Sequence, residues 1–249
     1  MKVTCHLGVP VSLDALDTKR WLDAASIDPA VLELRPDYRA LLIVADGLRP
    51  GPGDDFSERV LAAAETQARA RFADTPVEEH PHLAAWRDAF RAFGAKPQRT
   101  RPSAEALLRR LDAGLPRVDR LTDLYNAVSI AHVLPLGGED LDHYQGAARL
   151  VRADGTEPFE ITAGGEPAVE NPRPGEVVWR DDAGVTCRRW NWRQCVRTRL
   201  THDTTRAMFV FDALGPMTDD ELAAAGDALT ATLVEGSPGA QTVSRIVAG

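Results

Sequence analysis

The stretch Asp119–Asp142, DRLTDLYNAVSIAHVLPLGGEDLD, decides the predicted fold. Its first half predicts a helix with one apolar face, because apolar residues recur at three- and four-residue steps. Asp119 is the expected N-cap, and Pro135 is expected to end the helix. Gly137 and Gly138 predict a glycine turn, and the acidic residues Glu139, Asp140 and Asp142 follow it. A helix that runs into such a turn and an acidic cluster predicts the floor of a pocket.

The rest of the chain divides into predicted helices before this stretch and predicted strands after it. Helices are expected at residues 56–72, 77–93 and 104–111, with Ser103 as an N-cap, after a buried strand at residues 38–45. Short runs rich in Val, Ile and Trp predict strands at residues 146–153, 158–163, 176–180, 185–190 and 206–214, before a last helix at 220–234. This order predicts an α+β fold with a mainly antiparallel sheet in the second half.

The composition predicts a globular protein with one main domain. The chain has 249 residues, of which 44% are hydrophobic and 27% charged. We expect that domain at residues 38–235, between a poorly defined N-terminal segment at 1–37 and a C-terminal tail at 236–249. No apolar run reaches the roughly 18 residues that a membrane helix needs, and the first residues lack the apolar core of a signal peptide. We therefore expect a cytoplasmic protein with no membrane partner.

The cysteines and histidines predict neither a metal site nor a cofactor. Cys5, Cys187 and Cys195 form no CxxC pair, so free thiols are expected. No His pair has the HExxH spacing, and His80 and His82 are expected at the surface of a helix N-terminus.

The charge is unevenly distributed along the chain. A net charge of −8 argues against non-specific nucleic-acid binding, because affinity for phosphate comes mostly from Lys and Arg. Residues 87–120, however, carry nine basic residues against four acidic ones, and residues 186–206 carry six Arg against one Asp. A local basic surface for a polyanion is one interpretation, and solvated helix faces are the other.

A second informative stretch is Cys187–Thr205, CRRWNWRQCVRTRLTHDTT. Trp190 and Trp192 could stack on a base, and Arg193 could pair with phosphate or carboxylate. Strand spacing would place Asn191 and Arg193 on one face and the two tryptophans on the other. The alternative is a tryptophan-anchored hydrophobic cluster with its arginines in solvent.

These stretches resemble the B3/B4-type editing domain of the phenylalanyl-tRNA synthetase beta chain. That family has a pattern close to V-D-x-T-N-x-V, six residues, then P-x-H-A-F-D, which aligns here with Asp123, Asn126, Val128, Pro135 and Asp140 without a gap. Two positions differ, since Tyr125 replaces the Thr and Gly137 replaces the His. The segment from about residue 83 to 214 also resembles freestanding, single-chain relatives, which carry a similar W-N-W-R run and a following threonine-rich run, here Thr201, Thr204 and Thr205.

The resemblance implies a freestanding trans-editing deacylase that hydrolyses the ester of a mischarged tRNA and binds its acceptor end. Such an ester is already activated, so an oriented water and donors for the oxyanion are enough. The predicted catalytic residues are Asn126, Asn191, Thr204 and Thr205. The predicted substrate-binding residues are Tyr125, Gly137, Gly138, Glu139, Asp140, Trp190 and Arg193, with Glu139 or Asp140 on the α-ammonium. Because Tyr125 and Gly137 reshape the pocket, we expect an amino acid smaller than tyrosine or of another shape.

Two other functions remain open from the sequence. One is a non-catalytic module that binds tRNA, a nucleotide or an amino acid in the same pocket. The other is a small-molecule hydrolase or transferase on the same scaffold.

Overall fold

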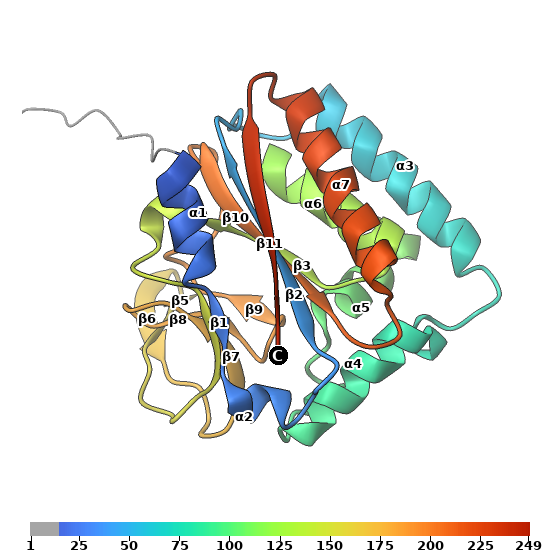
Figure 1. Ribbon diagram of the computed structural model, residues 1–249. Helices are drawn as coiled ribbons and strands as arrows, with labels where there is room; N and C mark the ends of the chain where they lie inside the picture. The colour runs from blue at the N-terminus through green and yellow to red at the C-terminus, as the bar shows by residue number, and fades with distance from the viewer. Residues whose placement is uncertain (1–14) are drawn as a thin grey trace, which may run out of the picture.

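A four-stranded antiparallel sheet forms the centre of the molecule (Figure 1). The structure, a computed structural model, describes residues 15–249. The strands lie in the order β11-β2-β10-β3, with bounds Gln241–Ala248, Arg39–Asp46, Arg206–Ala213 and Leu136–Asp140. β2 and β10 pair along all eight residues, from Arg39 opposite Ala213 to Asp46 opposite Arg206. Both strands are mainly apolar, which suits strands that are buried on both faces.

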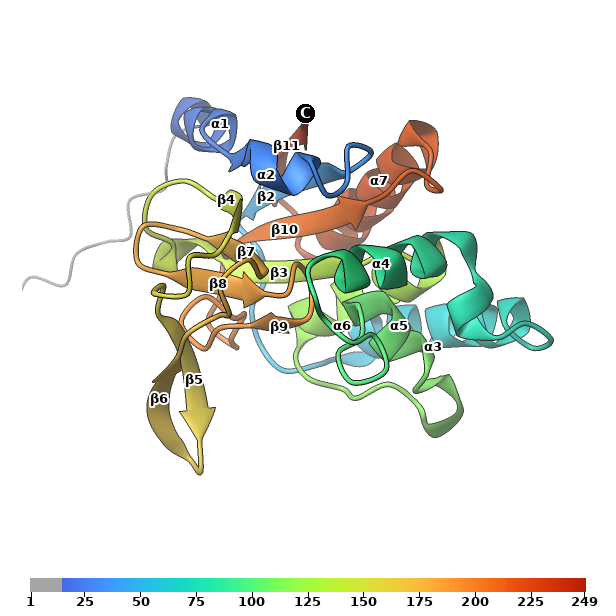
Figure 2. The same ribbon diagram turned by 90° about the horizontal axis from the view of Figure 1, so that it is seen from below.

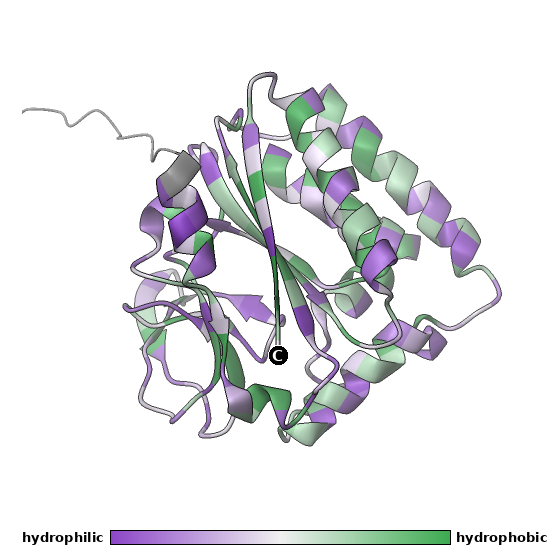
Figure 3. Ribbon diagram, viewed as in Figure 1, coloured by the Kyte–Doolittle hydropathy of each residue, from purple (hydrophilic) through white to green (hydrophobic). Residues whose placement is uncertain are grey.

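Three long helices cover one face of this sheet. They are α3 (Asp55–Arg71), α6 (Arg120–His132) and α7 (Asp219–Gly236). Their apolar sides pack on Leu41, Ile43, Phe209 and Phe211, which point to this face because alternate strand residues share a side. Green and purple residues alternate around α3 and α7 in Figure 3, as expected for helices with one face in the core. Each helix has a side-chain N-cap, from Asp54, Asp119 and Thr218.

The opposite face of the central sheet packs against a second sheet and three helices. The second sheet has the order β1-β4-β7-β8-β9, with bounds Ser26–Ile27, Arg149–Arg152, Val177–Arg180, Val185–Arg188 and Arg193–Gln194. The helices are α1 (Ala15–Asp23), α2 (Pro29–Leu32) and α4 (Pro81–Ala92). Leu42, Val44, Met208 and Val210 of the central sheet form one core with Trp86, Trp179 and Trp190 on this side. The central sheet is therefore covered on both faces.

The remaining elements lie at the edges of these layers. The hairpin of β5 (Phe159–Ala163) and β6 (Glu166–Glu170) projects from the body in Figure 2. The short helix α5 (Ser103–Leu108) contacts α6, and single 3-10 turns lie at Val77–Glu79, Leu111–Ala113 and Leu141–His143. The α+β class and the mainly antiparallel pairing are confirmed; β1 and β4 form the parallel pair among the described strands.

The predicted glycine turn is wrong. Gly137 and Gly138 lie inside β3, and neither has a positive φ. At Gly138 the requirement is space, because an added Cβ would lie 2.8 Å from Leu200 Cδ1 and 3.1 Å from Tyr125 Cδ1. The helix before β3 ends earlier than Pro135, at His132, and Val133 closes it in the left-handed conformation with φ 55°.

The ends of the chain contribute more structure than the sequence predicted. The expected tail contains β11, which pairs with β2 from Gln241 to Ala248. In the expected N-terminal segment, Leu22, Ala25 and Val31 belong to the core, while residues 1–14, including Cys5, lie outside the described residues.

Three local predictions near helix ends are also corrected. Ser103 is the first residue of α5, and its hydroxyl makes no cap bond. The predicted helix at 77–93 is split before Pro81, which begins α4 because a first-turn residue needs no N–H partner. His82 is 1% exposed and therefore is not a surface residue. Its Nδ1 lies 2.9 Å from the Val133 carbonyl oxygen, and its Nε2 accepts the Leu214 N–H at 3.1 Å.

Candidate functional site

A cavity of about 310 Å³ lies where α5, α6, β3, β10 and the turn between β8 and β9 meet. Seven of the residues predicted for the site line it: Tyr125, Asn126, Gly137, Glu139, Trp190, Asn191 and Arg193. These residues come from three separate parts of the sequence. The two stretches that the sequence analysis singled out therefore meet at one cavity.

Four predicted site residues do not line this cavity: Gly138, Asp140, Thr204 and Thr205. The Thr204 hydroxyl donates to Asp140 Oδ2 at 2.6 Å and accepts the Thr201 N–H at 2.9 Å. Asp140 Oδ1 also accepts the N–H of Asp142, at 3.0 Å. Thr205 is exposed. These polar groups fix the end of β3, and the cavity is built without them.

The W-N-W-R run does not have the predicted strand alternation. β8 ends at Arg188, and Arg189 and Trp190 have φ values of 49° and 68°, so the chain turns before β9. As a result Trp190, Asn191, Trp192 and Arg193 all line the cavity.

The two tryptophans of this run have different surroundings. Trp190 is fully buried, with its ring centroid 5.0 Å from that of Tyr38 and 5.3 Å from that of Trp86. Trp192 is only partly buried and lies between the guanidinium groups of Arg189 and Arg193, at 4.3 and 5.7 Å from its ring centre. Trp190 therefore supports the cavity as part of the core, and Trp192 is the more accessible aromatic surface.

Asp212 is the main cavity residue that the sequence analysis missed. It is 3% exposed and lines the cavity from β10. Its Oδ1 accepts the Tyr38 hydroxyl at 2.5 Å, and its Oδ2 accepts Asn191 Nδ2–H at 3.3 Å. Burial raises its pKa to about 7, while those two donors and the Trp179 indole act in the opposite direction. No Lys or Arg pairs with this carboxyl group among the described residues.

Glu139 provides a second buried acid. It is 2% exposed, and its Oε2 has no hydrogen-bond partner within residues 15–249. Burial raises its pKa to about 8, and the negative charge of Asp181 raises it further, while the hydroxyls of Tyr144 and Thr186 lower it. Glu139 is therefore largely neutral at pH 7 and carries a proton that it can donate.

The cavity lies within a segment of known family. The model of the B3/4 domain family matches residues 85–229, which is more than half of the chain. The chain belongs to the B3/4 domain family. Every residue that lines the cavity falls inside the matched segment.

One solved structure similar to this B3/4 domain protein is an N-terminal fragment of the phenylalanyl-tRNA synthetase beta-subunit from Pyrococcus horikoshii. The two share 12% sequence identity with a TM-score of 0.45, over 90% of this chain and 50% of the fragment. The chain thus corresponds to half the length of that fragment. No curated protein matches the chain.

Gly137 stands where the editing-domain pattern has His, and the Gln194 side chain lies beside it. Gly137 has no side chain, and a Cβ there would lie 3.0 Å from Gln194 Nε2. The Gln194 amide donates to the Gly138 carbonyl oxygen at 2.8 Å and lines the cavity. Tyr125 is buried at the other side, where its ring packs edge-on against Phe209 at 6.2 Å. An amide therefore borders the cavity on one side and a phenol ring on the other.

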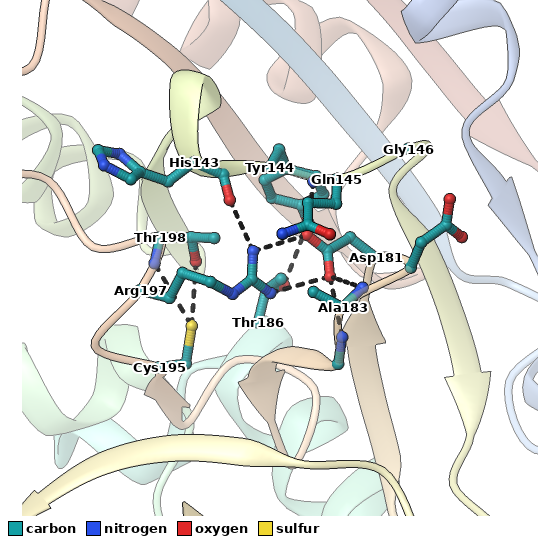
Figure 4. Close-up of polar contacts among 12 residues, drawn as sticks. His143, Tyr144, Gln145, Gly146, Asp181, Ala183, Thr186, Cys195, Arg197 and Thr198 are labelled. Atoms are coloured by element: carbon teal, nitrogen blue, oxygen red, sulfur yellow. Dashed lines mark hydrogen bonds and ion pairs between the residues drawn. The ribbon is translucent and has the colours of Figure 1, made fainter. Parts of the chain in front are cut away.

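An ion pair between Arg197 and Asp181 stabilises the β7–β8 hairpin (Figure 4). Arg197 binds both carboxylate oxygens of Asp181, at 2.8 and 2.9 Å. Asp181 also accepts the N–H groups of Gln145, Ala183 and Gly184. Since its charge is fully paired, Asp181 has a structural role.

Other catalytic arrangements have no support in the described part of the chain. Cys187 lines the cavity, but burial raises the pKa of its thiol, so it stays protonated and is a poor nucleophile. No group of three or more His, Cys, Asp or Glu side chains in residues 15–249 could hold a metal ion. None of the helices in that range is long and apolar enough to span a membrane.

Proposed function

We propose that this B3/4 domain protein is a freestanding deacylase that acts in trans and hydrolyses the ester bond of a mischarged aminoacyl-tRNA. The observation that carries the proposal is the buried Asp212 carboxyl group, which has two neutral donors and no cation among the described residues, in a cavity inside the family segment. An aminoacyl ester supplies the missing cation as its α-ammonium group. The acceptor end of tRNA is the proposed partner, in the cytoplasm, and no cofactor is needed.

We now propose Asp212 as the residue that binds the α-ammonium group, in place of Glu139 or Asp140. A bound ammonium group lowers the pKa of a carboxyl beside it, so the ligand itself would complete the ionisation of Asp212. Asn191 Oδ1 lacks a partner among the described residues and could accept a second ammonium proton.

The reaction needs little more than orientation, because the ester is already activated. Asn126 is 7% exposed, lines the cavity, and its amide makes no hydrogen bond in the described part of the chain. Its N–H₂ could donate to the oxyanion that develops when water attacks the carbonyl carbon. The protonated Glu139 could supply a second donor. This assignment uses no covalent intermediate and fits the protonated state of Cys187.

The cavity volume limits the substrate. About 310 Å³ is near the lower end of the roughly 300–1,000 Å³ typical of ligand pockets. It suits an amino-acid moiety with little beyond it, so we propose an amino acid smaller than tyrosine or of another shape.

The test is amino-acid release from a panel of mischarged tRNAs by the purified protein. We expect release from one or two aminoacyl-tRNAs, and at least a tenfold loss of turnover in Asn126→Ala. Asn171→Ala is the matched control, because this exposed amide donates to the carbonyl oxygens of Thr156 and Glu157 and lies outside the cavity.

The same assay distinguishes the alternative of a non-catalytic binding module. If the folded wild-type protein binds aminoacyl-tRNA but releases no amino acid from any member of the panel, the deacylase proposal is wrong and the binding module is favoured.

A further inference from the structure

A second cavity, of about 540 Å³, lies next to the first. Arg189 lines the second cavity, and its guanidinium group lies 4.3 Å from the ring centre of Trp192, which lines the first. Phe93 likewise lines the second cavity, with its ring 6.3 Å from that of Trp190. The linings of the two cavities are therefore in contact at Trp192 and Trp190.

The lining of the second cavity is strongly basic. Lys96 and Arg99 come from the loop after α4, Arg173 from the loop before β7, and Arg189 from the turn after β8. Its acidic lining residue, Glu176, is already held by Arg188 through two contacts of 2.8 and 3.0 Å. The positive charge of the cavity is therefore not balanced by its own wall.

The Lys and Arg side chains of the two basic segments differ in whether a carboxylate pairs with them. Most cations of the two basic segments are neutralised; Arg117, for example, pairs with Glu58 and Glu65. Among the described residues, Lys96, Arg99 and Arg173 form no ion pair, although all three are exposed. Among the cations of those two segments that form no ion pair with a described residue, Lys96 and Arg99 line this cavity, whereas Arg110 lines the first cavity and Arg199 lines neither. Arg173, from outside the two segments, adds a third unpaired cation here.

Arg189 is held in position for an anion. It donates through Nη1 to the Thr100 hydroxyl oxygen, and its Nε lies 3.6 Å from Glu176 Oε2. Burial is the largest influence on its pKa and lowers it, so nearby carboxylates do not compensate the loss of water. The Thr100 hydroxyl, which accepts from Arg189, still has its own proton to donate.

We infer that the second cavity binds phosphodiester groups of a single-stranded RNA end while the aminoacyl group esterified to its terminal nucleoside occupies the first. The ligand class follows from charge complementarity, since several unpaired cations and a hydroxyl suit consecutive phosphates. That the strand belongs to an aminoacyl-tRNA rests on the proposed function. The binding of RNA phosphates does not.

The test is RNA binding as a function of salt, measured by fluorescence anisotropy with a labelled single strand of about twelve nucleotides. The triple variant Lys96→Ala, Arg99→Ala, Arg173→Ala should reduce the slope of log affinity against log KCl concentration by about 2, at roughly 0.7 for each phosphate contact. At about 0.1 M KCl this corresponds to roughly 100-fold weaker binding.

The matched control is Lys19→Ala, Arg20→Ala, Arg59→Ala. It removes the same three charges from exposed positions on α1 and α3, away from both cavities. We expect less than a threefold change in RNA affinity. An equal loss of affinity in the two triple variants would overturn the inference, because net charge alone would then explain binding. Adenosine monophosphate that binds as tightly as the strand would also overturn it, in favour of a free phosphate ester.

A second substrate separates this inference from the proposed function. An aminoacyl-adenosine ester without phosphates should be hydrolysed equally by the wild-type protein and by the Lys96, Arg99 and Arg173 triple variant. Hydrolysis of this ester without salt-dependent RNA binding would overturn the RNA site alone. RNA binding with the expected slope but no hydrolysis of any ester would support the site and refute the deacylase.

Discussion

Asp212→Asn is expected to make the protein more stable and less active. The buried carboxyl group of Asp212 has its pKa raised from 3.8 to about 7, so its charged form is disfavoured in the folded state. At about 1.4 kcal/mol for each pKa unit, ionisation of Asp212 above pH 7 costs the folded state roughly 4 kcal/mol. An uncharged amide of the same shape avoids that cost.

The hydrogen bonds of Asp212 can survive the substitution. The new carbonyl oxygen can accept the Tyr38 hydroxyl, and Asn191 can rotate its amide so that Oδ1, now without a partner among the described residues, accepts the new N–H. Asp212→Asn therefore removes the negative charge and keeps both hydrogen bonds.

The sign of the pH dependence follows from the proton count. Between pH 3.8 and about 7 the folded state keeps a proton on Asp212 that the unfolded chain has lost, so wild-type stability falls as pH rises. Relative to the wild type, Asp212→Asn should gain roughly 4 kcal/mol at pH 8 and only about 1–2 kcal/mol at pH 5.

Urea unfolding followed by tryptophan fluorescence at the two pH values measures this difference. Asp37→Asn is the control, because Arg35 holds the pKa of Asp37 down to about 2, and its loss should destabilise the protein at pH 8. If Asp212→Asn is equally or less stable than the wild type at pH 8, the carboxylate is already compensated in the folded state. Asp212 then has no unbalanced charge for an ammonium group to neutralise.

Two further predictions concern stability. Burial lowers the pKa of His82 from 6.5 to about 4, so the unfolded chain binds more protons than the folded chain between these pH values. His82 should therefore lower the free energy of unfolding by roughly 3 kcal/mol as pH falls from 6.5 to 4. A His82→Gln variant whose urea unfolding has the same pH dependence as the wild type would contradict this. Gly138→Ala should destabilise by about 1–3 kcal/mol, since its Cβ would meet Leu200, Phe209 and Tyr125 within 3.1 Å, and an unchanged unfolding midpoint would refute the close packing.

The sequence predicted those features whose causes are local. Asp119 caps α6 by accepting the Thr122 N–H at 2.8 Å, because a cap needs only residues within one turn. The strand at 38–45 was recognisable as an apolar run between turn residues. Asn126 and Asn191 were likewise found by motif and do meet at one cavity.

The missed features depend on pairing between distant segments. β11 contains polar residues on an exposed edge, and only its register with β2 makes it a strand. Gly137 and Gly138 suggested a turn, because glycine serves both in turns and where chains pack closely. Only the distant neighbours Leu200 and Phe209 show that close packing is the relevant use at Gly138. Thr204 was misplaced because a motif does not show which partner, here Asp140, its hydroxyl finds.

Asp212 was detectable in principle, and its position supports a binding role. The run FVFDAL places a single acid in an eight-residue strand that is buried throughout, on the same face as Met208 and Val210. Folding gives no reason for an acid there, because the charge lowers stability and no cation in the described residues pairs with it. A ligand with a positive group gives such a reason, since it would pair with a carboxylate that Tyr38 and Asn191 already orient. If Asp212→Asn is more stable yet retains full hydrolysis, the carboxylate serves neither folding nor this reaction, and the ammonium site must be abandoned.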